Sequence, residues 1–109
     1  NYYACSKIFG ESLAAMYAHQ YEMSFICLRI GWVTRDDIVP FPSLFCSRRD
    51  VVQAILLAIE APEDLRYDVF FVHSDNTPNF VDIEHTKEVL GYDPADRGEE
   101  KESGGEMPS

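Results

Sequence analysis

The sequence predicts an α/β domain in which a helix, a strand, a helix, a strand and a last helix follow one another. Two observations predict this class. The runs at residues 24–30 and 67–72 are rich in β-branched and aromatic side chains, whereas the segments around them space their apolar residues as helices do. Strands that alternate with helices favour a parallel sheet covered by helices. The 109 residues, 46% of them hydrophobic, allow one small folded domain.

The first half of the chain predicts a helix, a strand and a long connection. Within residues 3–20, apolar side chains recur at helical spacing and form one stripe, which consists of Phe9, Leu13, Met16 and Tyr17. The run at 24–30 is nearly continuous in apolar residues and ends at Gly31, which favours a buried parallel strand. Residues 31–46 hold two prolines and the one tryptophan of the sequence, and a connection of this length is typical of a binding loop.

The second half predicts a capped helix followed by a strand. Ser47 is a candidate N-cap because an acid, Asp50, follows three residues later. The helix continues to the residues before Pro62 with a core-facing stripe of Val51, Val52, Ile55, Leu56 and Ile59. The second β-rich run, 67–72, leads into a turn at residues 76–79.

A short last helix and an acidic tail complete the chain. The helix carries one face of Ile83, Thr86, Val89 and Leu90, with Gly91 at its natural C-terminal position and Pro94 beyond. From Gly98 onward the composition is that of a disordered, solvated tail. We therefore expect a folded part at residues 1–97 and a tail at residues 98–109. Because two strands make a poor free-standing core, the folded part is expected to be the C-terminal portion of a larger domain.

The charge of the chain excludes some classes of partner. The net charge is −10, and residues 60–109, with fourteen acids and four bases, carry all of it. Such a surface repels phosphate, so nucleic-acid binding is disfavoured, while it suits a protein that works in high salt. No apolar run approaches the roughly 18–20 residues that a bilayer span needs, and we expect a soluble, cytoplasmic protein.

Cysteines and histidines do not predict a metal site. The three cysteines, Cys5, Cys27 and Cys46, are widely spaced and lack a C-x-x-C pair, so neither a disulfide framework nor a thiolate site is expected. The three histidines are also scattered, and each is expected to lie at the surface or half buried: His19, His73 and His85.

The strongest chemical signal is a tyrosine and a lysine one helical turn apart. Tyr3 and Lys7 are at i and i+4, so both project from one face of the predicted helix. A lysine cation beside a phenol favours the phenolate, which prepares a tyrosine for general acid–base chemistry. Alone, the pattern has a plain alternative, in which Tyr3 is an interface aromatic and Lys7 a solvated cation.

The surrounding residues resemble a known family. The matching parts are Y-x-x-S-K from Tyr3 to Lys7, F-G-E at residues 9–11, L-R-I-G at residues 28–31, S-R-R-D-V-V at residues 47–52 and L-G-Y-D-P at residues 90–94. These segments resemble the extended short-chain dehydrogenases/reductases, the NAD-dependent epimerase/dehydratase family, and are most similar to uronate and related sugar dehydrogenases of bacteria and haloarchaea. The resemblance covers residues 1–97 and implies the C-terminal portion of a Rossmann-like domain that lacks the glycine-rich dinucleotide-binding half.

The resemblance implies a role for each matching position. Tyr3 would be the catalytic acid/base, and Lys7 would assist it and hydrogen-bond the nicotinamide ribose of NAD or NADP. The expected cofactor-binding residues are Tyr3, Lys7, Ile30 and Gly31, and the expected substrate-binding residues are Trp32 and Arg35 in a sugar-pocket loop at residues 32–46. Plain alternatives remain: Gly31 could serve only a tight turn, and Trp32 could serve only packing.

Substrate and reaction subtype stay open. Uronate dehydrogenases place an arginine where this sequence has Pro40, so a neutral or phosphorylated sugar is as open as a uronate. The function implied is an NAD(P)-dependent sugar dehydrogenase, with an epimerase or dehydratase as the alternative and a homodimer as the expected assembly. No G-x-x-G-x-x-G is present, so these residues alone are expected to be inactive and either marginally stable or self-associating. A non-catalytic interaction module is the second class of function.

Overall fold

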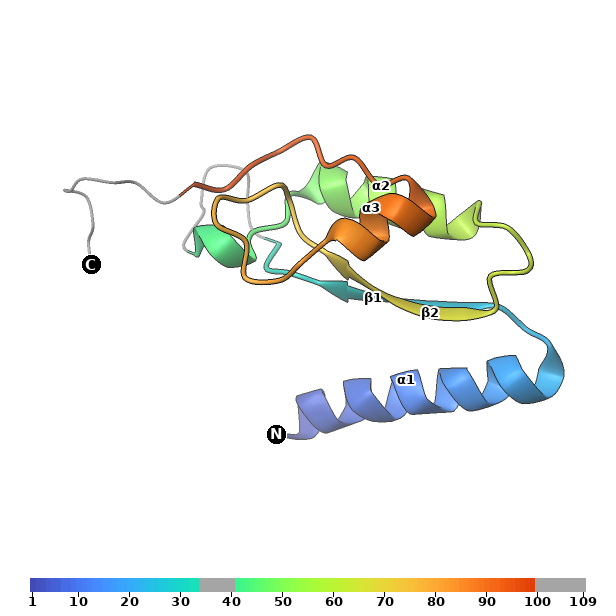
Figure 1. Cartoon of the computed structure of the whole chain (residues 1–109). Helices are drawn as coiled ribbons and strands as arrows, with labels where there is room; N and C mark the ends of the chain where they lie inside the picture. Colours follow the sequence, from blue (N-terminus) through green and yellow to red (C-terminus); the bar gives the residue numbers. More distant parts are fainter. Residues whose placement is uncertain (34–40, 100–109) are drawn as a thin grey trace.

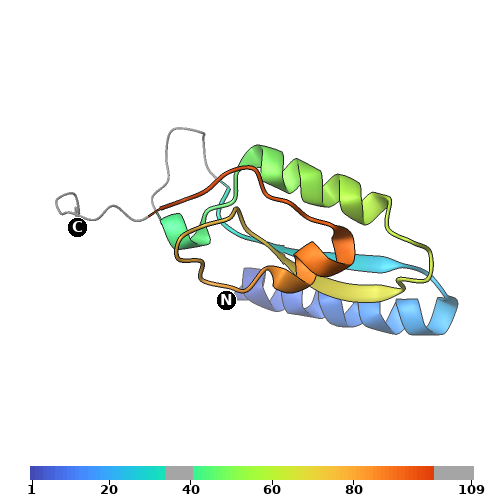
Figure 2. The same cartoon turned by 45° about the horizontal axis from the view of Figure 1, so that its top comes forward.

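A computed structural model describes residues 1–33 and 41–99. The elements in chain order are the helix α1 (Tyr2–Tyr21), the strand β1 (Phe25–Ile30), the 3₁₀ turn η1 (Pro42–Leu44), the helix α2 (Arg48–Ile59), the strand β2 (Tyr67–Val72) and the helix α3 (Glu84–Leu90). Figure 1 shows three layers, with α1 on one face of the sheet and α2 and α3 on the other, and Figure 2 shows the same order.

The sheet consists of two parallel strands. β1 and β2 pair along their whole length, from Phe25 opposite Tyr67 to Ile30 opposite Val72. The predicted parallel arrangement is therefore confirmed, and both strands end at the same edge. The predicted helices and strands all appear, with bounds that differ from the expected ones by one or two residues. The connection at residues 31–46 was predicted as a loop, and the structure adds the short 3₁₀ turn η1 within it.

The helix α2 begins as predicted but buries a different face. The Ser47 hydroxyl accepts a hydrogen bond from the Asp50 amide at 3.2 Å, which confirms the N-cap. The buried residues of α2 are Asp50 and Ala54, whereas four members of the predicted core-facing stripe are exposed: Val52, Ile55, Leu56 and Ile59. The prediction of that stripe was wrong because the small Ala54 allows close packing and the Asp50 carboxylate finds buried partners.

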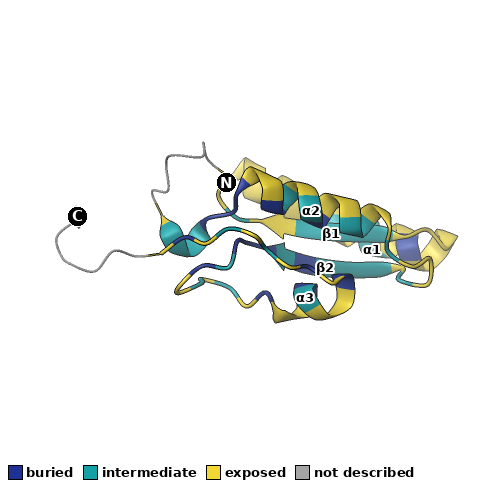
Figure 3. Ribbon diagram, turned by 90° about the horizontal axis from the view of Figure 1, so that it is seen from above, coloured by how far each residue is buried: buried dark blue, intermediate teal, exposed yellow. Residues whose placement is uncertain are grey.

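The helix α1 is the least buried element of the structure. Its first turn is capped by Asn1, whose side-chain oxygen accepts from the Ala4 amide at 2.7 Å. Ala18 is its one buried residue, and the predicted stripe is largely exposed, with Phe9 66% and Met16 51% accessible. The parts of the α1 ribbon that are visible behind the sheet in Figure 3 are mostly yellow, the colour of exposed residues. A shallow apolar groove of about 440 Å³ lies beside the helix and is lined by Gly10, Leu13, Ala14, Tyr17, Met23 and Phe25.

The core lies between the sheet, α2 and the C-terminal segment. Its buried members are Cys46, Ala54, Val72, Ile83 and Tyr92. Burial is the main reason that the pKa of the Cys46 thiol is raised to about 12, so this thiol is neutral and chemically inert. Of the face predicted for α3, Thr86 and Leu90 are buried, whereas Val89 is exposed. Gly91 closes the helix with φ 74°, which a glycine adopts without strain.

The packed part extends two residues beyond the predicted boundary at residue 97. The Gly98 amide donates to the Asn76 side-chain oxygen at 2.8 Å, and the Thr77 amide donates to the Gly98 carbonyl at 2.9 Å. A short parallel bridge also joins Thr77 and Glu99. Composition alone missed this attachment because it depends on partners about twenty residues away. The rest of the predicted tail lies outside the described residues.

Candidate functional site

The candidate site lies where the two strands end. β1 and β2 run in the same direction, and the N-terminal end of α1 lies beside their carboxyl ends (Figure 1). Ligands of parallel α/β sheets bind at this edge, because the loops that follow the strands gather there. The fold therefore brings the first turn of α1 to the same end of the molecule as the residues that follow β1.

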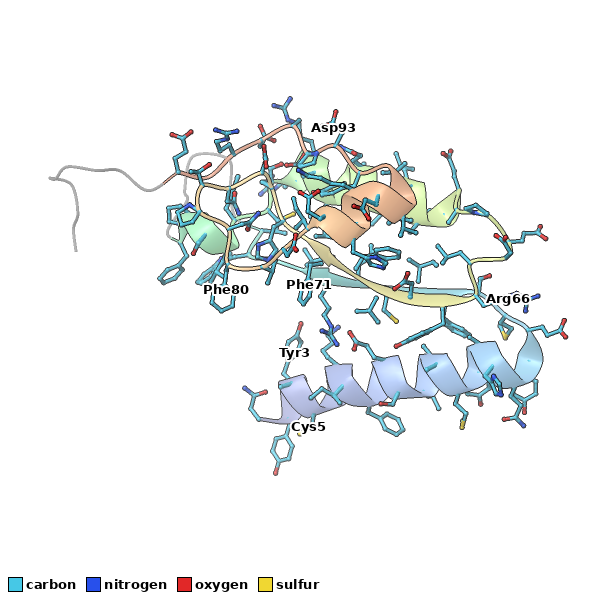
Figure 4. All side chains as sticks on the ribbon, viewed as in Figure 1. Tyr3, Cys5, Arg66, Phe71, Phe80 and Asp93 are labelled. Carbon is cyan, nitrogen blue, oxygen red and sulfur yellow. The ribbon has the colours of Figure 1, made fainter. Side chains whose placement is uncertain are left out.

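Tyr3 and Lys7 come together on α1, as the sequence predicts. The Lys7 ammonium lies over the Tyr3 ring, 5.3 Å from the ring centroid. Tyr3 is 71% exposed, and in Figure 4 its side chain points from α1 toward the sheet layer. The Ser6 hydroxyl donates to the Tyr3 carbonyl at 2.7 Å and adds a bond within this turn. The arrangement presents a phenol and a cation side by side to solvent.

The predicted residues of the strand end are held by a set of main-chain bonds. The Gly31 amide donates to the Val72 carbonyl at 3.0 Å, and the Trp32 amide donates to the Leu44 carbonyl at 2.7 Å. Ile30 and Trp32 remain partly exposed, at 43% and 46%. The structure thus places Ile30, Gly31 and Trp32 on one hydrogen-bonded stretch, with accessible side chains on either side of the glycine.

The neighbours of Gly31 leave no room for a side chain at this position. A Cβ at this position would lie 2.5 Å from the Leu44 carbonyl oxygen and 2.7 Å from Cδ2 of His73. Neither distance is sterically allowed, so any larger residue displaces the η1 connection or the imidazole. This close approach explains the glycine without a tight turn, since Gly31 is not among the residues with positive φ.

His73 was predicted to lie at the surface or half buried, and the structure contradicts this. Its side chain is 4% exposed, and its Nδ1 lies 2.9 Å from the Asn79 side-chain oxygen. The Tyr92 hydroxyl donates to the His73 carbonyl at 2.8 Å. His73 is the first residue after β2, and that position at the carboxyl end of a strand is the one sequence signal that could have indicated a place near the site.

Two further residues of the connection at residues 31–46, Phe41 and Arg35, bear on the candidate site. Phe41, which lies in the predicted sugar-pocket loop but was not singled out there, packs its ring against Trp32 with the centroids 4.9 Å apart. Arg35, the second predicted substrate-binding residue, lies outside the described residues, as does Pro40. The signal that could have found Phe41 is its place next to two prolines in a long connection.

An ion pair joins α1 to the sheet close to the candidate site. Both oxygens of Glu11 accept from Arg29, from Nη2 at 2.7 Å and from Nε at 2.9 Å. This bidentate hydrogen bond holds the pKa of the Glu11 carboxyl below its usual range. The Tyr67 hydroxyl also donates to the Glu11 carbonyl at 3.3 Å. These contacts set the distance between α1 and the strands.

Metal ligation and membrane insertion receive no support from the described part of the chain. Within residues 1–33 and 41–99, no group of three or more His, Cys, Asp and Glu side chains is arranged to hold a metal ion. None of the helices in these ranges combines the length and the apolar character that crossing a bilayer requires.

Comparison with known proteins shows that the chain is similar to parts of sugar dehydrogenases. No protein-family model matches it. It is 32% identical over 104 residues to the NAD-dependent glucose-6-phosphate dehydrogenase of Haloferax volcanii, covering 92% of this chain and 39% of that enzyme.

Two solved structures show the same fold. A uronate dehydrogenase from Agrobacterium tumefaciens, a Y136A mutant complexed with NAD, matches with a TM-score of 0.72 at 32% identity, over 86% of this chain and 35% of that one. The glucuronic acid dehydrogenase of Chromohalobacter salexigens matches with a TM-score of 0.77 at 29% identity, over 88% of this chain and 36% of that one.

These matches confirm the predicted family resemblance and the predicted partial Rossmann-like α/β fold. The chain spans under half the length of each relative, from 35% to 39% of the three described above. A relative from Haloferax volcanii also fits the acid-rich composition of the chain.

Proposed function

We propose that this chain, a homologue of part of the NAD-dependent sugar dehydrogenases, belongs to an NAD(P)-dependent oxidoreductase that acts on a hydroxyl or carbonyl group of a sugar or sugar derivative. The observation that carries the proposal is the Tyr3–Lys7 pair, with the lysine ammonium 5.3 Å from the centre of the tyrosine ring. The pair lies at the end of the molecule where the strands end, and the relatives that match this chain oxidise sugars by name.

The chemistry assigned to the chain is a proton transfer. Tyr3 takes the proton of a sugar hydroxyl during oxidation and returns it during reduction, and the cation of Lys7 stabilises the charge that the phenol acquires. The high exposure of Tyr3 leaves its hydroxyl accessible to a substrate. A nicotinamide cofactor would supply the acceptor for the hydride that leaves the same carbon.

The donor types at the site fit part of such a cofactor. The Lys7 ammonium and the Tyr3 hydroxyl are suited to hydrogen-bond a ribose, and Ile30 and Gly31 lie at the strand end where a nicotinamide ring would pack. The pyrophosphate would need a different place. At the N-termini of α1 and α2 one amide each is already bonded to a capping side chain, that of Asn1 and that of Ser47, and the glycines of the chain lack the dinucleotide-binding spacing. These 109 residues by themselves are therefore expected to bind NAD weakly.

The decisive test is substitution of the tyrosine in the natural protein that contains this sequence. Tyr3→Phe is expected to lower the rate of sugar-dependent NAD reduction by about 10²- to 10⁴-fold, because the proton acceptor is lost. Tyr2→Phe is a matched control, since Tyr2 is an adjacent tyrosine with 93% exposure. Equal rates of NAD reduction for the Tyr3 variant and the unchanged protein would contradict the proposal.

Product analysis separates the remaining alternatives. A dehydrogenase forms reduced cofactor in proportion to oxidised sugar, whereas an epimerase or dehydratase changes the sugar with no net reduction of NAD. Uronates, neutral aldoses and sugar phosphates, each tested with NAD and with NADP, would identify the substrate class and the cofactor preference. A natural protein that alters none of these sugars would favour the non-catalytic interaction module.

A homodimer is the assembly that we propose for the complete protein. Its support is the exposed apolar side of α2, where Val52, Ile55, Leu56 and Ile59 are accessible to solvent. Exposed rows of this kind are typical of association surfaces. We also propose that the complete protein is located in the cytoplasm.

A further inference from the structure

The candidate site carries a pair of aromatic rings that the proposed proton transfer does not use. The ring centroids of Trp32 and Phe41 lie 4.9 Å apart, with the ring planes tilted by 39°. The two side chains remain 46% and 51% exposed. Aromatic side chains contribute most to stability when they are buried, so a pair that stays half exposed at the ligand-binding edge of a sheet is a candidate contact surface.

Hydrogen bonds hold the backbone beneath both rings. The Trp32 amide donates to the Leu44 carbonyl at 2.7 Å, and the Trp32 carbonyl accepts from the Cys46 amide at 3.0 Å. The Leu44 amide also donates to the Phe41 carbonyl at 2.9 Å, across the η1 turn. Because both rings are attached to one hydrogen-bonded unit, the pair is a preformed surface, and a ligand does not have to order it.

The η1 turn is supported from its other side as well. The Phe80 amide donates to the Ser43 carbonyl at 2.9 Å. Gly98 packs so closely that a Cβ there would lie 2.7 Å from the Pro42 carbonyl oxygen. The segments after β2 thus fix the position of the aromatic pair relative to the ends of the strands.

We propose that Trp32 and Phe41 form a stacking surface for the ring of a cyclic sugar. This inference rests on the proposed function and adds the mode in which the substrate is held. The faces of a sugar ring carry C–H groups and its edge carries hydroxyls, so an aromatic surface takes a face and leaves the hydroxyls free. The surface recognises the ring and not a charge, so neutral sugars, uronates and sugar phosphates would share it.

Fluorescence tests the proposal in the natural protein that contains this sequence, with a Trp32→Phe variant measured beside it so that the difference in emission reports on Trp32. Titration with glucose and with glucuronate is expected to change this difference in a saturable way at millimolar concentrations, the range of a weak contact. Sorbitol carries similar hydroxyls without a closed ring and is expected to give no saturable change. An equal response to sorbitol, or no response to either sugar, overturns the proposal.

Two phenylalanine variants give a second, independent measurement. Phe41→Leu keeps an apolar side chain and the Trp32 reporter but removes one ring, and it is expected to raise the dissociation constant about tenfold. Phe80→Leu is the matched control, because Phe80 is 73% exposed and is bonded through its main chain to the same turn. Circular dichroism of both variants checks that each is folded. Equal effects of the two substitutions contradict the stacking surface.

Failure of this inference is distinguishable from failure of the proposed function. If Tyr3→Phe abolishes sugar oxidation in the natural protein while the sugar titrations show no saturable change, the stacking surface is wrong and the proposed function stands. If the titrations behave as expected and the natural protein reduces no cofactor, the sugar-binding surface stands and the proposed chemistry is wrong.

Discussion

Asp50 is the centre of a buried polar network. Its side chain is fully buried, and its two oxygens accept from the Ser74 hydroxyl at 2.6 Å, the Ala95 amide at 2.6 Å and the Asp96 amide at 3.2 Å. All three donors come from segments far along the chain. The carboxylate therefore connects the start of α2 to the residues after β2 and to the C-terminal segment.

Replacement of this carboxylate is predicted to destabilise the fold. In Asp50→Asn, an amide NH₂ would face donors where an acceptor is needed, and the expected loss is about 2–3 kcal/mol of unfolding free energy. Urea denaturation measures it. Asp93→Asn is the control, because Asp93 is exposed and the neighbouring contacts use its main chain. A midpoint equal to that of the control would show that the network contributes little.

At the scale of single elements, α1 depends on few contacts. Its one buried residue is Ala18, so apolar packing contributes little to its attachment. The bidentate Glu11–Arg29 pair and the hydrogen bond from the Tyr67 hydroxyl link this helix to the strands through side chains. The position of the first turn of α1 therefore depends on a partly exposed ion pair. Tyr3 lies in this turn, so its position depends on the same pair.

Glu11→Gln is predicted to loosen α1 without unfolding the rest. The expected cost is about 1 kcal/mol, because the pair is partly screened by solvent. Acid is expected to loosen α1 in the same way, because the pKa of the Glu11 carboxyl is lowered in the folded state. The contribution of the Glu11–Arg29 pair to stability is present above the ordinary pKa of 4.5 and is lost as the pH falls through the folded-state pKa.

Hydrogen exchange measured by mass spectrometry checks this prediction. Amides of residues 2–21 are expected to exchange faster in the variant, while those of β2 keep their rate. Glu22→Gln serves as the control, because the Glu22 side chain is 83% exposed and its nearest arginine nitrogen lies at 4.0 Å. Uniformly faster exchange in both strands and helices would mean that the ion pair supports the whole fold.

The exposed side of α2 makes a separate prediction about association. Leu56→Lys is expected to shift the chain from self-associated species toward monomer, because a charge in the exposed apolar row opposes its burial against a second copy. Sedimentation velocity measures the distribution. Val89→Lys on α3 is the control, as Val89 is also exposed. If the unchanged chain already sediments as a single monomer, the proposed association surface is wrong.

At the scale of the whole molecule, the main feature is the excess of acidic over basic side chains. The net charge is −10, and the C-terminal half carries it. Several acids are paired, as in Arg49 with Asp96 at 2.7 Å and Arg97 with Asp75 at 3.3 Å, but the bases are too few to pair them all. Like charges on a small surface repel one another and lower the stability of the compact state.

Salt is therefore predicted to stabilise the chain. Raising KCl from 0.1 to 1 M shortens the screening length from about 10 Å to about 3 Å, which removes most of the repulsion between exposed carboxylates. We expect the thermal midpoint to rise by several degrees, roughly the effect of 1 kcal/mol on a domain of this size. A neutral osmolyte at equal osmolality is the control. A midpoint that is unchanged or lower in KCl would contradict the charge argument.

The sequence by itself determined the elements and their order. The bounds of α1, β1, α2 and β2, the Ser47 cap and the glycine that ends α3 follow from spacing and capping, which act between residues a few positions apart. The Tyr3–Lys7 pair was predictable for the same reason, because four residues make one turn of a helix.

The tertiary structure alone decided which surfaces are buried and which residues meet. The core-facing side of α2 and the burial of His73 depend on segments that are distant in sequence. The pairing of Phe41 with Trp32 lies within one connection, which the Phe80 amide supports from a distant segment. Gly31 illustrates the physical reason: its lack of a side chain matters because Leu44 and His73 arrive within 2.8 Å of the missing Cβ. Local patterns carry no information about such approaches, which close packing of the whole chain determines.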